Sequence, residues 1–365
     1  MVQLKNICSK GSSSIAQKDL ENRSGIYPIY GASGFIKNVD FYQQEKPYVA
    51  VVKDGAGVGR VMCLPEKSSV IGTMQYIIPK HGVNVGYLAY ALEHMNLAKY
   101  YTGATIPHIY FKDYCNEVLP AHTQEEQQNI ATSLDKVSEL ITLRKEQLVK
   151  LDRLVKSRFV ELFGSLNSNE KGLDIVSIEE LCTLIKDGTH QTPTYTDDKE
   201  NGFKFLSSKD VMTQKICWDE IKYIPAELHE KLYATIRPMR NDILMSKNGV
   251  NYGVAAVNDT DEVFDIYVSL ALLRPITDRV NPVYLRCAIN NPDTKRQFDS
   301  SIKGIGVPNL HLGEIKKTKV LLPPMSKQNE FVAFVEHTDK SKLAIQASLD
   351  KLETLKKSLM QEYFG

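Results

Sequence analysis

The most regular hydrophobic pattern in the chain begins at Gln124 and ends before Gly164, a stretch without glycine or proline. Ten positions, spaced alternately by four and three residues, follow one another along it. They are Ile130, Leu134, Val137, Ile141, Arg144, Leu148, Leu151, Val155, Arg158 and Leu162. Since eight of these ten are apolar, the spacing predicts one long helix with a coiled-coil seam. Thr123 and Glu126 predict a capping box at its start, and Gly164 is the expected end.

The same pattern occurs again 201 residues later, where Gln127–Gly164 aligns without a gap on Gln328–Gly365. Seven of the ten seam positions of the second helix are apolar: Phe331, Val335, Ile345, Leu349, Leu352, Leu359 and Tyr363. The other three are Thr338, Lys342 and Lys356. Each helix has one apolar stripe that needs a partner, and antiparallel packing of the two helices on each other satisfies both stripes. Packing of each helix on its own body, or on an outside helix, is the alternative.

Each long helix follows a body rich in short β-type runs, and both bodies open with the same phrase of apolar residues. The first body has runs at 48–52, 60–63 and 76–78, and a helix is expected over Val85–Tyr101. The fold class is therefore α+β, with two α/β domains separated by a two-helix antiparallel coiled coil in a pseudo-two-fold repeat. The expected domains are residues 1–118 and 172–322, each followed by a helix, at 119–165 and 323–365. Residues 165–171 form a polar linker, and extra material near Thr189–Glu230 makes the second body longer.

Composition and charge narrow the function classes. No apolar run approaches the ~20 residues that span a bilayer, and the chain starts without a secretory signal pattern, so a cytoplasmic protein without a membrane partner is expected. The six cysteines are far apart and are expected to be buried thiols. Residues 1–118 carry 12 basic and 9 acidic side chains, a net charge of +3, and residues 166–322 carry 20 and 22, a net charge of −2. Such weak charge indicates no DNA binding, or DNA binding shared with a more basic partner.

No catalytic, cofactor or metal motif is recognisable in the chain. The Gly55–Gly59 run has the wrong spacing for a dinucleotide loop and is followed by β-type residues, so a hairpin turn is the better interpretation. The steps Asp54-Gly55 and Asn248-Gly249 stand at the same place in both copies and suit such turns. The chain itself is therefore not expected to be an enzyme.

The first body carries Gly25-Ile-Tyr-Pro-Ile-Tyr-Gly-Ala-Ser-Gly34, and the second carries Gly188-Thr-His-Gln-Thr-Pro193 and Phe205-Leu-Ser-Ser-Lys-Asp210. Both bodies close with Gly-x-x-x-Pro, at Gly103 and Gly304, then with Leu-Pro and Gln before the long helix. Taken together, these motifs resemble those of the specificity subunit of type I restriction–modification systems, over nearly the whole chain.

The resemblance implies a non-catalytic subunit that reads a bipartite target in double-stranded DNA with two target-recognition domains. It also implies two methyltransferase subunits docked on the helices and a restriction subunit that acts as a translocase. The complex would methylate adenine N6, with S-adenosylmethionine, ATP and Mg bound by the partner subunits and no cofactor in this chain.

Polar and aromatic residues on the expected loops are the candidates for DNA contact. In the first body they are Tyr27, Tyr30, Lys37, Lys53, Asp54 and Arg60. In the second body they are Thr189, His190, Gln191, Thr192, Tyr195, Ser207, Lys209, Lys247 and Asn248. Lys53 and Lys247 occupy equivalent places, which suggests a shared phosphate contact. A solvated turn residue is the alternative for each of these.

Polar positions on the helices are candidates for contact with the methyltransferase subunits. They are Gln127, Arg144, Lys150, Arg158, Gln328 and Lys351, and packing between helices explains all six equally well. Two other functions stay open: a two-headed coiled-coil scaffold that does not bind DNA, and the recognition subunit of a split methyltransferase–nuclease without a motor subunit.

Overall fold

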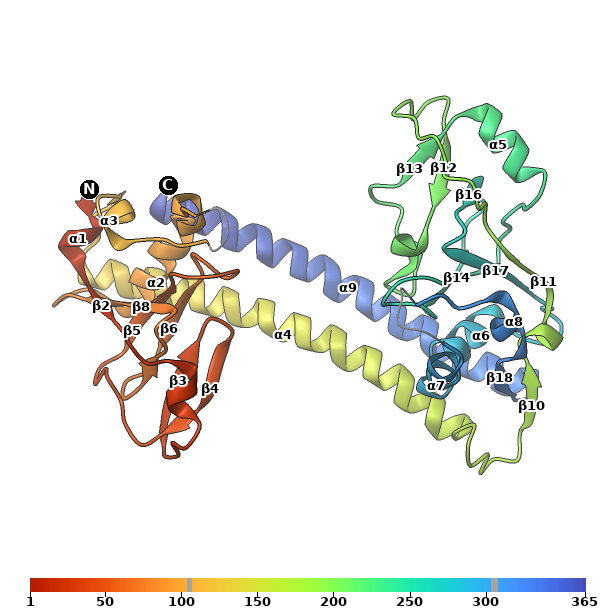
Figure 1. The fold of residues 1–365 in the computed structure, drawn as a ribbon, viewed down its shortest axis with the longest axis horizontal. Helices are drawn as coiled ribbons and strands as arrows, with labels where there is room; N and C mark the ends of the chain where they lie inside the picture. The colour runs from red at the N-terminus through yellow and green to blue at the C-terminus, as the bar shows by residue number, and fades with distance from the viewer. Residues whose placement is uncertain (104–106, 303–307) are drawn as a thin grey trace. The chain divides into compact units, whose positions relative to one another are not determined.

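The structure is a computed structural model that describes residues 1–103, 107–302 and 308–365. The chain divides into two compact units, Met1–Gln147 with Ile345–Gly365, and Leu148–Ala344. Each unit therefore contains one body and parts of both long helices (Figure 1). The motif residue Gly304 lies outside the described residues.

The first body is built on two small sheets. Strands β2 (Cys8–Ser12), β8 (Met74–Pro79), β5 (Tyr48–Val52) and β6 (Val61–Leu64) form one, in that order, and β4 (Gly34–Val39), β3 (Tyr27–Gly31) and β7 (Ser69–Val70) form the other. A third pair joins β1 (Val2–Gln3) to β9 (Val118–Leu119). The helical elements are α1 (Leu4–Ile7), η1 (Gln17–Leu20), α2 (Val85–His94), η2 (Leu97–Tyr100) and α3 (Phe111–Tyr114).

The second body repeats this topology with longer connections. Its four-stranded sheet has the order β11 (Cys182–Asp187), β17 (Leu270–Pro275), β14 (Ile243–Ser246) and β15 (Ala255–Val257). Its three-stranded sheet has the order β13 (Lys222–Ile224), β12 (Phe203–Leu206) and β16 (Phe264–Ile266), and β10 (Asp174–Ser177) pairs with β18 (Lys319–Leu322). The remaining elements are η3 (Glu179–Leu181), η4 (Ser208–Val211), α5 (Ala226–Tyr233), α6 (Pro282–Ile289), α7 (Pro292–Ser301) and α8 (Leu312–Lys317).

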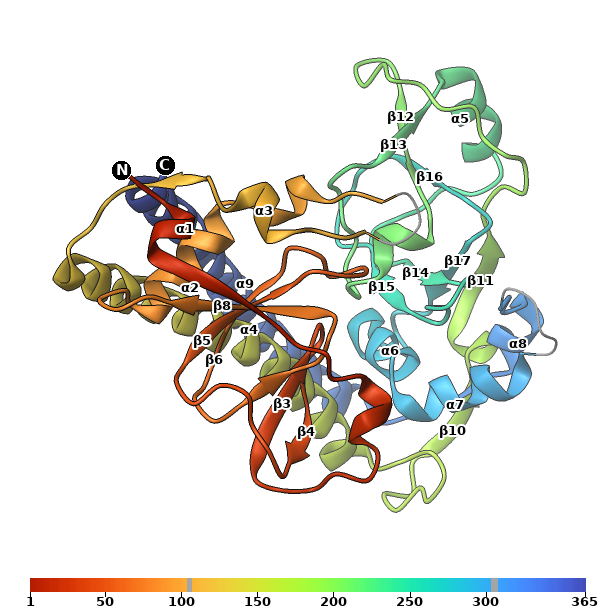
Figure 2. The ribbon, with the colours of Figure 1, turned by 60° about the vertical axis from the view of Figure 1, so that its left-hand side comes forward.

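The two bodies correspond strand by strand. In each four-stranded sheet, the strand that comes first in the sequence pairs with the strand that comes last in the sequence. In each three-stranded sheet, the central strand has one antiparallel and one parallel neighbour. Helix α5 has no counterpart in the first body, where only residues 40–47 connect the equivalent strands. Both ribbon views place α5 beside β12 and β16 (Figure 1 and Figure 2). The duplication predicted from the helices therefore extends to the sheets.

The long helices are α4 (Gln124–Phe163) and α9 (Met325–Phe364). The predicted capping box at the start of α4 is present, with Thr123 Oγ1 accepting from the Glu126 N–H and Glu126 Oε2 accepting from the Thr123 N–H. Gly164, at φ +76°, ends the helix. All ten seam positions of each helix are buried or half-buried, which confirms the predicted apolar stripes.

Within each unit the two helices run in opposite directions. In the first unit His122 contacts the backbone of Tyr363, and further along the helix Lys145 pairs with Glu353 at 2.8 Å. In the second unit, Asp152 pairs with Lys342 at 2.5 Å, and the ring centroids of Phe159 and Phe331 lie 5.5 Å apart. The residue numbers rise along α4 as they fall along α9, as expected for antiparallel pairing.

The helix ends also pack on the bodies, so the alternative interpretation contributes as well. Phe163, the last residue of α4, lies 5.1 Å from the ring of Tyr284 on α6. Phe364, the last residue of α9, lies 5.2 Å from the ring of Tyr87 on α2. All four side chains are at most 5% exposed. Each helix therefore ends in an aromatic anchor on a body, and the same anchor occurs in both units.

Two local predictions need correction. The helix expected over Val85–Tyr101 stops at His94, because Asn96 adopts φ +50° and η2 follows it. The turn after β5 packs closely against η2, since a Cβ on Gly59 would lie 2.5 Å from the Ala98 nitrogen. The expectation that all six cysteines are buried is confirmed for Cys8 and wrong for Cys63, which is exposed on β6, while the other four are half-buried.

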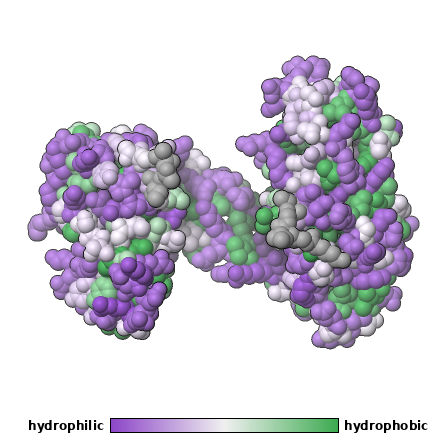
Figure 3. Space-filling view, viewed as in Figure 1, coloured by the Kyte–Doolittle hydropathy of each residue, from purple (hydrophilic) through white to green (hydrophobic). Residues whose placement is uncertain are grey.

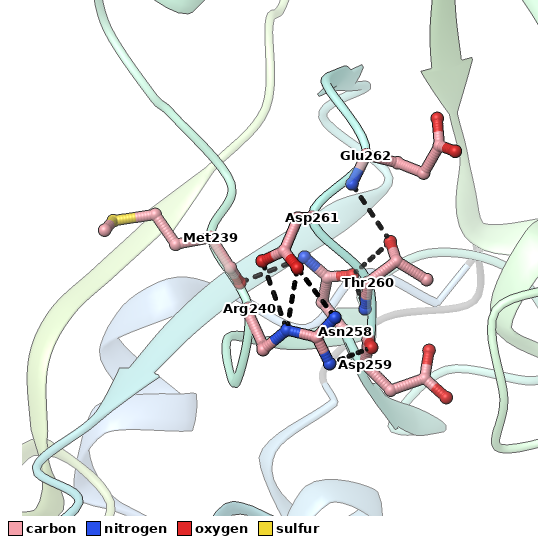
Figure 4. A network of polar contacts seen from close by, with 7 residues as sticks. All are labelled: Met239, Arg240, Asn258, Asp259, Thr260, Asp261 and Glu262. Carbon is pink, nitrogen blue, oxygen red and sulfur yellow. Dashed lines mark hydrogen bonds and ion pairs between the residues drawn. The ribbon is translucent and has the colours of Figure 1, made fainter.

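A polar network closes one end of the four-stranded sheet in the second body (Figure 4). The guanidinium of Arg240 donates to both carboxylate oxygens of Asp261, at 3.1 Å from Nε and 2.8 Å from Nη2. The fully buried Asn258 donates to the Met239 carbonyl and accepts from Thr260. This network joins the start of β14 to the loop after β15, and the hairpin turn described below lies at the opposite end of these two strands.

Candidate nucleic-acid interface

The turn that joins the central hairpin has the same backbone geometry in both bodies. In the first body Gly55 and Gly59 have φ values of +89° and +85°, and in the second Gly249 and Gly253 have +87° and +85°. The Gly59 N–H donates to Val52 O, and the Gly253 N–H donates to Ser246 O, both at 2.8 Å. These turns link antiparallel strands, which confirms the predicted hairpin.

A second loop meets this turn in each body. The Ile109 N–H donates to Lys53 O at 2.9 Å, and the Leu310 N–H donates to Lys247 O at 2.8 Å. Residues 109 and 310 are related by the same 201-residue offset as the long helices. The backbone scaffold around Lys53 and Lys247 is therefore equivalent, as predicted from the sequence.

The side chains on that scaffold differ. Lys53 Nζ lies 3.6 Å from Asp54, and its side chain is 27% exposed. Lys247 Nζ lies 2.6 Å from Asp187 Oδ2, and its side chain is only 6% exposed. Burial opposes ionisation of Asp187, but the hydrogen bond and charge of Lys247 outweigh it and hold the pKa of Asp187 below its usual value. The predicted phosphate contact is thus wrong for Lys247, because its ammonium group is buried and neutralised.

In the first body the basic candidates make local hydrogen bonds. Lys37 Nζ donates to Leu20 O at 3.0 Å. Arg60 donates to Ala32 O at 2.8 Å, so it ties the central hairpin turn to the β3–β4 turn while remaining exposed. Asp54 forms a short contact with His108 Nδ1, which links the central turn to the loop that precedes Ile109.

The aromatic candidates of the first body pack edge to face with neighbours. Tyr27 lies 4.8 Å from Tyr42, and Tyr30 lies 6.0 Å from Phe35, whose ring is 60% exposed. Sequence reasoning missed other exposed rings in this body: Tyr101 and Tyr110 are 57% and 49% exposed. The ring of Tyr110 lies edge to face with that of His108, with the centroids 4.1 Å apart. Their position beside the Gly103–Ile109 repeat motif is the feature of the sequence that could have identified them as candidates.

The candidates of the second body fall into two groups. Thr189, His190, Gln191 and Thr192 follow β11, and His190 Nε2 lies 3.3 Å from Asp187. Tyr195 is 43% exposed and has the Lys222 ammonium 4.0 Å above its ring.

The second group lies at the end of β12 and in the central turn. The Ser207 N–H donates to Asp210 Oδ2 at 2.7 Å, which makes Ser207 the cap of η4. Lys209 is exposed, 3.8 Å from Asp210. Asn248 Oδ1 is buried and has no hydrogen-bond partner among the described residues. Ser207 is therefore structural, whereas Lys209 is accessible.

Two of the predicted partner contacts are wrong. Gln127 is 8% exposed, accepts from the Asn84 N–H at 3.0 Å and donates to His122 O. Gln328 is fully buried, accepts from the Asn281 N–H at 2.8 Å and donates to Pro323 O at 2.8 Å. Each glutamine joins the first turn of a long helix to the start of α2 or α6, so neither is available to a partner.

The other helix candidates divide between seam and surface. Arg158 bridges Glu161 and Glu330 at 2.9 and 3.6 Å, as expected for a seam arginine that meets acidic residues. Arg144 donates to Gln147, while its Nε is buried without a partner in the described part of the chain. Lys150 and Lys351 are exposed.

No group of three or more metal-ligating side chains occurs within residues 1–103, 107–302 and 308–365. In the same ranges, no helix is long and apolar enough to cross a membrane. Hydrophilic residues cover most of the face of each unit that Figure 3 shows.

Comparison with known proteins identifies the family. The type I restriction modification DNA specificity domain matches residues 1–153 and 170–356. The MjaVIII specificity subunit of Methanocaldococcus jannaschii is 23% identical over 98% of this chain and 89% of that protein. The MjaIX specificity subunit of the same organism is 22% identical over 88% of this chain and 78% of that protein.

Two solved structures share the fold. The S subunit of a type I restriction-modification system from M. genitalium superimposes with a TM-score of 0.64 at 15% identity, over 100% of this chain and 95% of that one. A chain from a study of complex assembly in the type I R-M system gives 0.55 at 15% identity, over 99% of this chain and 96% of that one. The duplicated bodies, their matching sheets and the family match over nearly the whole chain show that this protein belongs to the specificity subunits of type I restriction–modification systems.

Proposed function

We propose that the chain reads a bipartite DNA sequence, with one recognition domain on each half-site and the paired helices as the spacer. The observation that carries this proposal is the equivalence of the two central turns. Each is held by two positive-φ glycines and by the same backbone hydrogen bond to residue 109 or 310. A backbone scaffold that both bodies share, with different side chains on it, is what two readers of different sequences require.

The helices suit the task of a rigid spacer. Each has 40 residues, which corresponds to about 60 Å at 1.5 Å per residue. Half-sites on one face of DNA recur about every 34 Å. Paired helices of this length are therefore long enough to separate two readers by one helical turn or more.

The chain acts without catalytic chemistry of its own in this proposal. Two methyltransferase subunits dock on the repeated surfaces and modify adenine N6, with S-adenosylmethionine bound in those subunits. A restriction subunit supplies ATP- and Mg-dependent translocation and cleavage. The partners also contribute phosphate contacts, which explains why a reader with a net charge of +1 does not need a strongly basic surface.

Adenine-methylation sequencing of cells with and without the gene, in the presence of the methyltransferase gene, tests the proposal. We expect one motif of two short sequences separated by a fixed spacer, present only when both genes are intact. A matched control deletes the methyltransferase gene alone. If removal of the gene abolishes no bipartite motif, the proposal is contradicted. Co-purification of partners without any DNA binding favours the alternative function as a scaffold.

A further inference from the structure

Two exposed cations border the central turn of the first body. Arg60 ends that turn, and its guanidinium donates to Ala32 O at 2.8 Å. Lys112 lies on α3, three residues after Ile109, whose N–H donates to Lys53 O beside the turn. Arg60 and Lys112 are both exposed, and neither forms an ion pair with a residue that the structure describes. Both charges therefore remain available to a ligand.

Neighbouring rings place the Lys112 ammonium group beside the turn. Its Nζ lies 5.1 Å from the centroid of the Tyr110 ring. Tyr110 lies edge to face with His108, which in turn contacts Asp54 on the central turn. An aromatic face attracts a cation without neutralising it. This series of contacts therefore orients Lys112 and leaves its charge free.

The second body has no cation at either of these two positions. Val254 stands where Arg60 does, directly after the second glycine of the turn, and Gly313 stands 201 residues after Lys112. The backbone around these positions pairs in the same way in both bodies. The difference therefore lies in the side chains that the shared scaffold carries.

Two lysines reach the second turn, and a carboxylate neutralises each of them. Lys247 is 6% exposed and lies 2.6 Å from Asp187. Lys295 on α7 lies 3.7 Å from the centroid of the Tyr252 ring, which belongs to the turn, and is hydrogen bonded to Asp299. Neither ammonium group is therefore free to meet a phosphate.

The tip of the second turn is apolar, and the overall charge of the two bodies differs in the same sense. Val250 is 86% exposed, and an apolar side chain can contact a thymine methyl group but cannot bind a phosphate. The net charge is +3 for residues 1–118 and −2 for residues 166–322. Local and overall charge therefore both assign the attraction for a polyanion to the first body.

We propose that the first body holds the DNA backbone at its central turn, where Arg60 and Lys112 bind phosphate groups, and that the second turn meets DNA without an ionic contact. The inference rests on the proposed function and deepens it, because it assigns the ionic contact of the shared turn to one half-site. Phosphate contacts fix the position of a protein on a duplex and carry no sequence information. The first turn therefore anchors the complex, and the second contributes non-ionic contacts.

The salt dependence of binding tests the proposal. The intact complex, co-expressed with its methyltransferase, is titrated with a duplex that carries the mapped motif. Each neutralised phosphate contributes about 0.9 to the slope of log K against log salt concentration. We expect Arg60→Gln and Lys112→Gln each to reduce that slope by about one, and to weaken binding about 3- to 10-fold at 0.1 M salt. The loss should be the same for duplexes in which one base pair of the motif is changed.

Three further variants control for lost charge and for misfolding. Lys46→Gln removes an exposed lysine before β5, at the end of that strand far from the turn, and should keep the wild-type slope. Arg60→Lys and Lys112→Arg retain the charge and should keep both the slope and the motif.

A gain of charge tests the asymmetry directly. A Cβ on Gly313 would meet no atom within 4 Å, so Gly313→Lys is tolerated sterically. It places a lysine in the second body where the first has Lys112, and we expect the slope to increase by about one. An unchanged slope in this variant overturns the assignment of the asymmetry to these side chains.

Neutral backbone substitution gives an independent readout. One phosphate at a time in the motif duplex is replaced by a methylphosphonate, which carries no charge. We expect the wild-type complex to lose affinity at positions that the Arg60→Gln or Lys112→Gln complex no longer senses. These positions should all lie in one half-site, and a distribution over both half-sites contradicts the proposal.

The outcomes separate this inference from the proposed function. A wild-type complex that confers no bipartite motif and binds no duplex overturns both. A wild-type complex with its motif, in which both glutamine variants keep the wild-type slope, overturns only the phosphate contact. Loss of discrimination at a single base pair in Arg60→Gln also overturns it, because the arginine then reads a base edge.

Discussion

Asp187 holds the ammonium group of Lys247 at 2.6 Å, in a site where the lysine side chain is 6% exposed. The equivalent residue of the first body, Lys53, has only the half-exposed Asp54 at 3.6 Å, because Ser12 stands where Asp187 does in the strand register. One scaffold position thus carries an accessible lysine in one body and a buried ion pair in the other. The contribution of this ion pair to the stability of the second body can be measured.

Asp187→Asn should destabilise the second body by about 2 to 3 kcal/mol, because it leaves a buried ammonium without its counter-charge. Trp218 is the single tryptophan of the chain and belongs to the second unit, so its fluorescence in a urea titration reports this unit. Glu227→Gln removes an exposed pair with Lys231 and serves as the control, with no measurable change expected. Equal midpoints for the two variants would show that the buried pair contributes nothing.

The same pair predicts a dependence of stability on pH. In the folded state the pKa of Asp187 lies below its usual value, whereas an unfolded aspartate has a pKa of about 3.9. The stabilisation is therefore complete well above pH 4 and is lost as the pH falls through the folded pKa. The difference in urea midpoint between wild type and Asp187→Asn should shrink between pH 7 and about pH 3. A difference that stays constant over this range contradicts the assignment.

Gln328→Ala should lower the stability of the second unit by about 2 to 3 kcal/mol, because the buried Asn281 N–H and Pro323 carbonyl lose their partner. Asn329→Ala changes the exposed neighbour and is the control. Methyltransferase co-purification should survive in the fraction of Gln328→Ala that folds. A Gln328→Ala protein with wild-type stability that no longer binds the methyltransferase would restore Gln328 as a partner contact.

Insertion of one heptad into each long helix, at matched seam positions, should lengthen the DNA spacer and leave both half-sites unchanged. Seven residues add about 10 Å, or roughly three base pairs at 3.4 Å each. Methylation mapping of the variant measures the spacer. A two-residue insertion into each helix is the control, because it rotates the seam by about 200° and should abolish methylation. An unchanged spacer after the heptad insertion contradicts the role of the helices as a ruler.

The spacing of apolar residues along the sequence was sufficient to predict the two long helices. The alternating four- and three-residue spacing, the cap at Thr123 and the stop at Gly164 all depend on residues close together along the chain. The hairpin turns at Asp54-Gly55 and Asn248-Gly249 are local for the same reason, since positive φ favours glycine wherever the turn stands. The helix predicted to reach Tyr101 was too long, because the left-handed conformation of Asn96 ends it and the spacing of apolar residues does not reveal that conformation.

The sequence by itself determined the duplication, the two helices with one apolar stripe each, and the equivalence of Lys53 and Lys247. Only the tertiary structure decided what each side chain does. Gln127 and Gln328 look like surface residues by type, but backbone groups of the bodies enclose them. Lys247 looks like a phosphate contact until the fold brings Asp187, 60 residues earlier, against it. Burial and pairing arise between strands that are distant in sequence, so spacing along the chain cannot reveal them.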